Sequence, residues 1–312
     1  HQALVFNTTG SSNTAVGSAA LDANTDGSSN VAVGTSALTA NTTGGNNIAV
    51  GVSALPLNTT GNRSVAIGGQ ALEKNNADDN VAVGYQALEE TTTGTDNVAV
   101  GSFALDTNTT GSSNTAVGRD ALTSNTTANN NTAVGYNSLT ANTTGIQNVA
   151  VGSAALDANT TASYNSALGY NALGANTTGS VNTAVGKSAL EVNTTGVNNV
   201  AVGANALDAN TTASNNTAVG YQTLGLNTTG SANVGIGPYA AYLNTTGTNN
   251  ITIGYNALYN NTTASNNTAV GYEALFDNTT GSKGTALGYQ SVGYADSRII
   301  ENDNKNVSVG YL

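Results

Sequence analysis

The sequence has no cysteine, methionine or tryptophan, a single histidine, and charged residues at only 8% of its 312 positions. Without cysteine there is no disulfide framework, and with His1 alone neither a Ser-His-Asp triad nor a histidine metal site can be assembled. The carboxylate pairs Asp78-Asp79 and Glu89-Glu90 are expected to be solvated turn charges, because acid–base catalysis needs burial to tune them. We therefore predict that the chain is not an enzyme and has no metal site and no cofactor.

Positive charge is also scarce. Seven lysines and arginines are scattered along a chain with 18 acidic residues, for a formal net charge of −11. Nucleic-acid-binding proteins carry a basic patch or stripe, and the acidity also disfavours anionic membranes. No apolar run approaches the roughly 20 residues that a membrane-spanning helix needs. These observations exclude nucleic acid as a partner and membrane insertion of this segment.

What the sequence does have is one repeated phrase, well preserved at residues 267–281 as Asn-Thr-Ala-Val-Gly-Tyr-Glu-Ala-Leu-Phe-Asp-Asn-Thr-Thr-Gly. Its central glycine recurs every 17 residues from Gly17 to Gly288, except for one interval of 16 between Gly68 and Gly84, and a further copy, Gly310, follows after 22. A fixed period this short is typical of a solenoid with one coil per repeat. We predict an all-β fold, a β-solenoid (parallel β-roll) of about 18 coils.

Positions in the repeat are numbered from the central glycine. A β-branched residue dominates at −3, alanine at −2 and an aliphatic residue at −1, which is the pattern of a short strand. Side chains alternate along a strand, so −3 and −1 share one face and the alanine lies on the other. We expect the −1 aliphatics and the leucine at +4 to form the core. The alanine face should then pack on another chain or on a second wall of the same coil. No residue replaces the central glycine, which predicts positive φ or close backbone approach there.

Asparagine recurs at −4 and at +7, and stacked coils should align each set into an amide ladder. The asparagine at +7 also opens an Asn-x-Thr sequon, the acceptor pattern for N-linked glycans. One interpretation is a column of glycans; the other is that Asn and Thr serve turn hydrogen bonds and a threonine ladder. The candidate glycosylation sites are Asn7, Asn41, Asn58, Asn108, Asn125, Asn142, Asn159, Asn176, Asn193, Asn210, Asn227, Asn244, Asn261 and Asn278.

The regularity predicts a solenoid over residues 1–291, followed at 292–312 by an irregular insertion and a final partial repeat. Tyrosine recurs at +1. Because Arg119 and Lys187 occupy the same position in other repeats, position +1 should face solvent. Both chain ends cut through a repeat, so we expect a processed chain, an ordered fragment, or a subunit whose ends meet other subunits. Uncapped coils at both ends favour end-to-end stacking.

The phrase Asn-Thr-Ala-Val-Gly-Tyr-x-Ala-Leu and the segment Ser64-Val65-Ala66-Ile67-Gly68-Gly69-Gln70-Ala71 resemble the head repeats of YadA-like trimeric autotransporter adhesins. Similar runs occur in phage tail-fibre and metagenomic fibre proteins. The resemblance spans nearly the whole chain. It implies a left-handed parallel β-roll, three chains packed side by side, and an adhesive role.

We therefore expect an extracellular structural or adhesive fibre protein on a cell or virion surface, possessing N-linked glycans if the sequons are used. Its partners would be copies of itself, as a homotrimer or an end-to-end filament, and glycans or a host surface. The shaft of a phage or virus tail fibre is the alternative. An ice-binding solenoid is less favoured, since adjacent threonines in an extended strand place only one side chain outward.

Overall fold

The computed structural model describes residues 2–292 and 307–310 of the chain. Throughout that part the fold is all-β, with one three-residue strand per coil, a 17-residue repeat and parallel pairing, which confirms the predicted β-solenoid. No helix in these residues is long and apolar enough to cross a membrane. The chain comprises two compact units, one formed by His1–Ala154 with Asn159–Thr161 and the other by Ala155–Ala158 with Ala162–Leu312.

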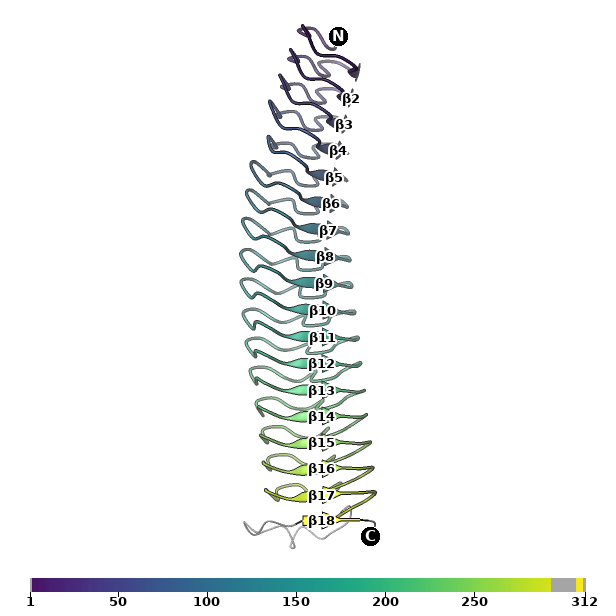
Figure 1. The fold of residues 1–312 in the computed structure, drawn as a ribbon, viewed down its shortest axis with the longest axis vertical. Helices are drawn as coiled ribbons and strands as arrows, with labels where there is room; N and C mark the ends of the chain where they lie inside the picture. The colour runs from purple at the N-terminus through teal and green to yellow at the C-terminus, as the bar shows by residue number, and fades with distance from the viewer. Residues whose placement is uncertain (1, 293–306, 311–312) are drawn as a thin grey trace. The chain divides into compact units, whose positions relative to one another are not determined.

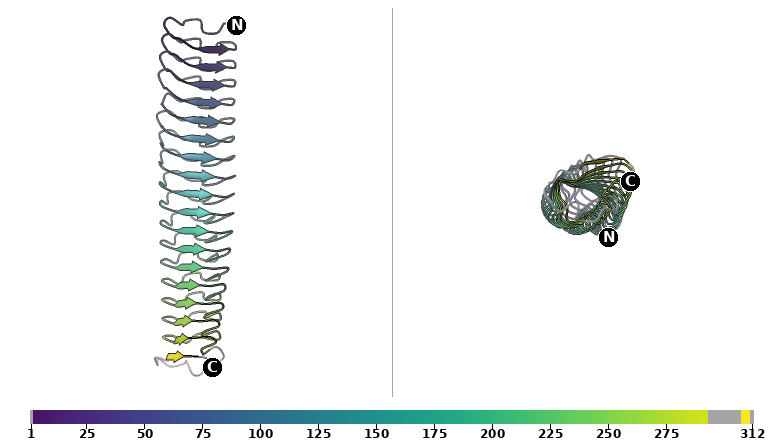
Figure 2. Two further views of the ribbon diagram at one scale, coloured as in Figure 1. Left: turned by 45° about the vertical axis from the view of Figure 1, so that its right-hand side comes forward. Right: turned by 90° about the horizontal axis from the view of Figure 1, so that it is seen from below.

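Each strand is the −3 to −1 segment of its repeat, and strands follow one another in sequence order within each unit (Figures 1 and 2). The first unit contains β1 (Thr14–Val16), β2 (Val31–Val33), β3 (Ile48–Val50), β4 (Val65–Ile67), β5 (Val81–Val83), β6 (Val98–Val100), β7 (Thr115–Val117), β8 (Thr132–Val134) and β9 (Val149–Val151). The second contains β10 (Ser166–Leu168), β11 (Thr183–Val185), β12 (Val200–Val202), β13 (Thr217–Val219), β14 (Val234–Ile236), β15 (Ile251–Ile253), β16 (Thr268–Val270), β17 (Thr285–Leu287) and β18 (Val307–Val309).

Repeats pair in register, so that every repeat position forms a file along its unit. Ala116, for example, pairs with Ala133, and the flanking Thr115 with Thr132. Outside the strands the backbone continues to bond from coil to coil, as in the bond from Leu38 N–H to the carbonyl of Ala54 (3.0 Å). Because neighbouring coils satisfy one another's backbone groups, a short strand is sufficient in each coil.

The core consists of the alanine at −2, the alanine at +3 and the leucine at +4. In one part of the second unit it is formed by Ala257, Leu258, Ala269, Ala274, Leu275 and Ala286, all nearly inaccessible to solvent. The prediction for the +4 leucines is thus confirmed. The alanine face packs on a second wall of its own coil, which is one of the two expected alternatives.

The prediction that the −1 aliphatics are buried is wrong. Val16 is 58% exposed and Leu168 50%, and the −1 residues of the other described coils are exposed or half-buried. The strand has its alanine inward and its −3 and −1 side chains outward because the coil is narrow. The −2 side chain meets the +4 leucine across the interior, and where Gly235 replaces alanine, an added Cβ would already lie 3.4 Å from Leu224. Alanine fills this space in most coils, and the largest side chain that it holds in the described coils is Thr252, so valine and isoleucine point outward.

The central glycine has the conformation that the sequence predicted. Gly118 has φ of 135°, and a Cβ placed on it would lie 2.5 Å from the carbonyl oxygen of Gly135 in the next coil. The leucine at +4 is also left-handed, as at Leu122 with φ of 55°. A left-handed backbone penalises β-branched residues most, which accounts for leucine at this position instead of valine or isoleucine in nearly every coil.

The one-residue deletion is absorbed in the turn, because Val65 still pairs with Val81 and Ile67 with Val83. The irregular segment predicted at 292–312 falls mostly at residues 293–306 and 311–312, which lie outside the described residues, together with its charged residues Asp296, Arg298, Glu301, Asp303 and Lys305. The final strand, β18, is described and pairs in parallel with β17.

Candidate functional site

The outer face of the strands has a uniform composition in each unit. Its two rows, at −3 and −1, contain valine, isoleucine, leucine, threonine and one serine, and no charged residue in β1–β17. Several of these side chains are more than a third exposed, among them Val16, Ile48, Ile67, Val149, Leu168, Ile236 and Ile251. We name the outward −3 and −1 side chains of β1–β17 the strand face. The sequence could not identify it, because both faces of Val-Ala-Val are apolar.

Both predicted asparagine ladders are present, but they are built differently. At +7, Nδ2 in most coils donates to Oδ1 of the asparagine one coil earlier and to a carbonyl in its own turn. The ladder is interrupted where Thr91 replaces asparagine, and Oδ1 of Asn58 and of Asn261 receives no such bond. Asn125, for example, bonds Asn108 at 2.8 Å and the carbonyl of Ala128 at 3.1 Å. At −4, Oδ1 instead accepts the backbone N–H of the next asparagine, as between Asn30 and Asn47 (2.9 Å). These bonds satisfy the polar groups that a narrow coil has to bury.

The hydrogen bonds of the +7 ladder determine whether the sequon asparagines are available for glycosylation. Of the candidate sites, Asn7 is half-buried, Asn278 is 4% exposed and the remaining twelve are inaccessible. An N-linked glycan replaces one Nδ2 hydrogen, and within the ladder both hydrogens are donated inside the protein. A glycan and the folded coil are therefore mutually exclusive at positions such as Asn125. The hydroxyl of the first threonine is engaged as well, since Thr42 Oγ1 donates to the carbonyl of Thr59 (3.0 Å).

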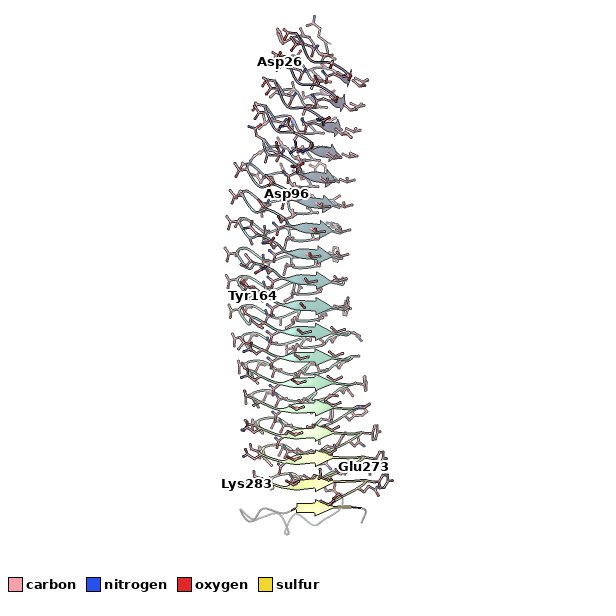
Figure 3. The ribbon with its side chains drawn as sticks, in the orientation of Figure 1. Asp26, Asp96, Tyr164, Glu273 and Lys283 are labelled. Atoms are coloured by element: carbon pink, nitrogen blue, oxygen red, sulfur yellow. The ribbon has the colours of Figure 1, made fainter. Side chains whose placement is uncertain are left out.

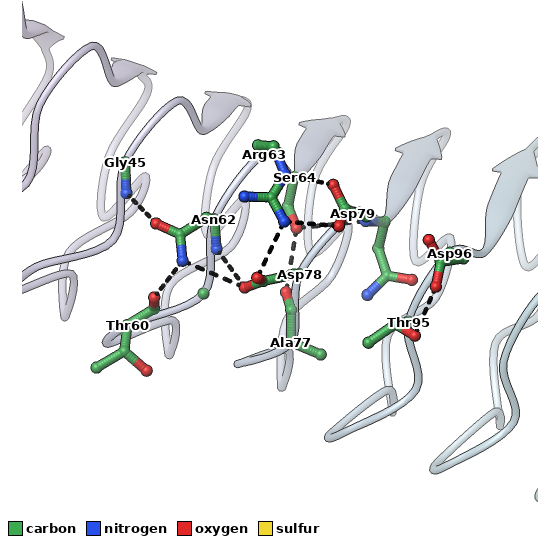
Figure 4. A network of polar contacts seen from close by, with 12 residues as sticks. Gly45, Thr60, Asn62, Arg63, Ser64, Ala77, Asp78, Asp79, Thr95 and Asp96 are labelled. Carbon is green, nitrogen blue, oxygen red and sulfur yellow. Dashed lines mark hydrogen bonds and ion pairs between the residues drawn. The ribbon is translucent and has the colours of Figure 1, made fainter.

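Charged residues gather around the deletion (Figure 4). Arg63 forms a two-pronged ion pair with Asp79, at 2.6 and 2.7 Å, and a longer contact of 3.1 Å with Asp78. The hydrogen bond from Arg63 lowers the pKa of the Asp79 carboxyl. These side chains are substantially exposed, so the cluster agrees with the prediction of solvated turn charge and adds little stability.

Glu89 departs from that prediction. The pKa of Glu89 is raised to about 7, chiefly by burial and next by a hydrogen bond with the Glu73 carboxyl one coil earlier. Burial also raises the pKa of Asp106 one coil later. The three carboxyl groups occupy position +5 of successive coils, so they form a column of acids in the first unit. The Gln70 amide donates to Glu73 (3.1 Å) and the Gln86 side chain bonds Glu89, and we assign the column no chemistry.

Aromatic residues form two columns in the second unit. At +1, Tyr255 stacks on Tyr272 (centroids 5.5 Å apart, planes at 13°) and Tyr272 on Tyr289 (5.0 Å, 7°). The tyrosines of this column are 41–48% exposed, as predicted for that position. At +5, Tyr259 stacks on both Tyr242 (5.5 Å) and Phe276 (5.3 Å).

Tyr239 joins the two columns at one end. Its ring is almost perpendicular to Tyr255 (84°, 6.2 Å) and to Tyr242 (84°, 5.7 Å). Between the columns lies an open groove of about 370 Å³, lined by Tyr239, Tyr255, Asn256, Tyr259 and Phe276. We name it the aromatic groove. The 17-residue spacing of the +5 aromatics was visible in the sequence, but the adjacency of the +1 and +5 columns was not.

No group of three or more histidine, cysteine, aspartate or glutamate side chains in residues 2–292 and 307–310 is arranged to hold a metal ion. The strand face and the aromatic groove are therefore the candidate functional surfaces of the described chain. Comparison with models of protein families finds no match, and comparison with curated proteins finds none either.

Proposed function

We propose that this chain is a segment of an extracellular structural and adhesive fibre, and that copies of it associate side by side through the strand face. The observation that carries the proposal is the exposure of that face. Its −1 row is aliphatic and its −3 row is aliphatic or hydroxyl-bearing, and neither row contains a charged residue along β1–β9 or along β10–β17. Soluble monomers rarely expose continuous apolar patches larger than a few hundred Å².

A second copy of the same chain is the partner that fits this face best. Each strand of β1–β17 has an aliphatic side chain at −1, and nine of them have a second at −3. This pattern repeats at the coil spacing, so identical chains match one another coil by coil. Burying apolar surface contributes roughly 25 cal/mol per Å², and a repeated face adds this contribution coil after coil. Closed cyclic assemblies are the usual outcome of such contacts, and the adhesin-like repeats favour a trimer.

The shaft of a phage or virus tail fibre stays the alternative prediction, since a laterally associated solenoid would serve it equally well. Ice binding stays less favoured. The first threonine of each turn, such as Thr42, directs its hydroxyl to a backbone carbonyl of the next coil, which leaves an incomplete outward threonine array. A thermal hysteresis measurement on the purified chain tests it.

The test of self-association compares two triple variants of the whole chain by light scattering after size-exclusion chromatography. Val100→Lys, Val117→Lys and Val134→Lys place three charges on the strand face. The control changes the exposed second threonines of the turns in the same coils: Thr110→Lys, Thr127→Lys and Thr144→Lys.

We expect the wild type and the threonine variant to be oligomeric, with a trimer as the smallest species, and the valine variant to be monomeric with an unchanged far-ultraviolet spectrum. A wild-type chain that stays monomeric at high concentration would refute lateral association. So would a valine variant that associates as well as its control.

A further inference from the structure

We propose that the aromatic groove of the second unit binds a linear, uncharged oligosaccharide. Two stacked aromatic columns flank it, Tyr239 closes one end, and the side-chain amide of Asn256 lies in its lining. The proposal deepens the adhesive part of the proposed function by giving it a ligand and a site. It does not depend on self-association.

The rings of the groove present hydroxyl groups and edges more than open faces. Each column is stacked, so Tyr259 is covered on both sides by Tyr242 and Phe276, and Tyr255 is covered on one side by Tyr272. Tyr239, nearly perpendicular to Tyr255, supplies a ring in a second orientation. A pyranose ring has an apolar C–H side that packs on aromatic carbon and a rim of hydroxyls that bonds phenol groups. Tyrosine combines these two kinds of contact in one side chain.

Asn256 supplies the polar group that would orient such a ligand. It is half-buried at position +2, and among the described residues its amide has no hydrogen-bond partner. Three of the four other +2 amides in the described part of this unit are engaged: Asn171 bonds Glu191 (2.7 Å), Asn205 bonds Asp208 (3.2 Å) and Gln290 bonds Glu273 (2.9 Å), and Gln222 is the exception. A free amide offers two donors and an acceptor, which suits a ligand rich in hydroxyls.

Charge argues against anionic ligands. No lysine or arginine lines the groove, and the neighbouring coil contributes Glu273 and Asp277. Lys283 lies at the opposite edge of the coils from Glu273, as Figure 3 shows. Single-stranded nucleic acids also stack on aromatic residues, but they need a positively charged groove, and sulfated or phosphorylated glycans would meet the same repulsion.

A proline-rich peptide is the other polymer that aromatic grooves bind. The covered faces of the two columns limit the packing of a proline ring and of a pyranose alike. The columns repeat one kind of contact from coil to coil, which suits a polymer of identical units. This repetition favours a sugar chain over a peptide.

The test titrates the whole chain with cellohexaose, chitohexaose and laminarihexaose and follows tyrosine fluorescence and calorimetric heat. A proline-rich decapeptide and a heparin hexasaccharide are titrated in parallel. The groove volume is at the low end for a ligand site, so we expect a Kd of about 0.1–1 mM for at least one neutral hexasaccharide.

Three variants locate the binding. Tyr239→Ala removes the end ring, and Asn256→Asp keeps the shape of the side chain but removes both donors. Tyr170→Ala is the matched control, because Tyr170 occupies position +1 in the same unit, is 58% exposed and touches no other ring among the described residues. We expect at least about a tenfold weaker binding in the first two variants, and less than a twofold change in the control.

The proposal is overturned if none of the three hexasaccharides binds, if Tyr170→Ala weakens binding as much as the other two variants, or if the peptide or heparin fragment binds more tightly than every neutral sugar. Failure of sugar binding in a chain that still forms trimers would remove this site and leave the fibre proposal standing. A monomeric chain that binds the sugar would refute lateral association and leave this site standing.

Discussion

The substitution Asn125→Asp perturbs the asparagine ladder with almost no change in the shape of the side chain. In the wild type, Asn125 Nδ2 donates to Asn108 Oδ1 (2.8 Å) and to the carbonyl of Ala128 (3.1 Å), while its Oδ1 accepts from Asn142 (3.1 Å). An aspartate keeps the acceptor but has no donor. Asn108 Oδ1 then loses its partner, the carbonyl of Ala128 keeps only the bond from Asn114 Nδ2 (2.9 Å), and both oxygens face a carboxylate.

One unsatisfied buried acceptor costs about 1–3 kcal/mol, and the buried carboxylate facing two oxygens adds to that cost, so the coil is destabilised by about 3 kcal/mol or more at pH 7. Burial next to other oxygens raises the pKa of the new carboxyl. Protonation supplies one donor and removes the charge. Since a carboxyl with a raised folded-state pKa loses its contribution to stability as pH rises, the variant should be closest to wild type at about pH 4.

Amide hydrogen exchange is the suitable measurement, because a repeat protein opens locally and a single melting temperature averages over many coils. We expect backbone amides of this coil to exchange about 150-fold faster at pH 7 after correction for intrinsic rates, given that 1.4 kcal/mol is tenfold. The control is Asn129→Asp, an exposed position whose Oδ1 accepts from the backbone N–H of Ser112 (2.6 Å), a bond that aspartate keeps. Equal protection in the two variants at pH 7 would refute the ladder's contribution, as would greater protection of Asn125→Asp at pH 7 than at pH 4.

Three further predictions concern single coils. Gly118→Ala should cost more than about 1 kcal/mol because of its left-handed φ. Gly111→Ala should cost less, although a Cβ there would lie as near a carbonyl of the next coil, since its φ is ordinary and alanine already occupies that turn position elsewhere in the chain; comparing urea midpoints checks this. Leu122→Ala should destabilise by about 2–5 kcal/mol and the half-exposed Val117→Ala by clearly less, and similar values by urea unfolding would contradict the orientation of the strand. Because the pKa of Glu89 is raised to about 7, unfolding free energy should fall as pH rises from 5 to 8, and Glu89→Gln should flatten that slope.

The period alone was sufficient for much of the fold. A 17-residue repeat that carries a β-branched triplet predicts one strand per coil, and parallel in-register stacking then aligns equal positions. That alignment is why the asparagine ladders, the exposure of the +1 tyrosines and the special backbone of Gly118 could all be predicted. Each depends only on the position within the repeat, which the sequence displays directly.

The tertiary structure decided which side of the strand is inside. Val-Ala-Val is apolar on both faces, so alternation separates the faces without assigning them. The assignment comes from the width of the coil, where Leu122 and its equivalents occupy the interior and leave room opposite for alanine or, at Thr252, for threonine. The same closure of the coil brings position +5 beside position +1, so that Tyr259 and Tyr255 border one groove. Distances across a coil depend on how its turns fold back, and no periodicity along the chain contains that information.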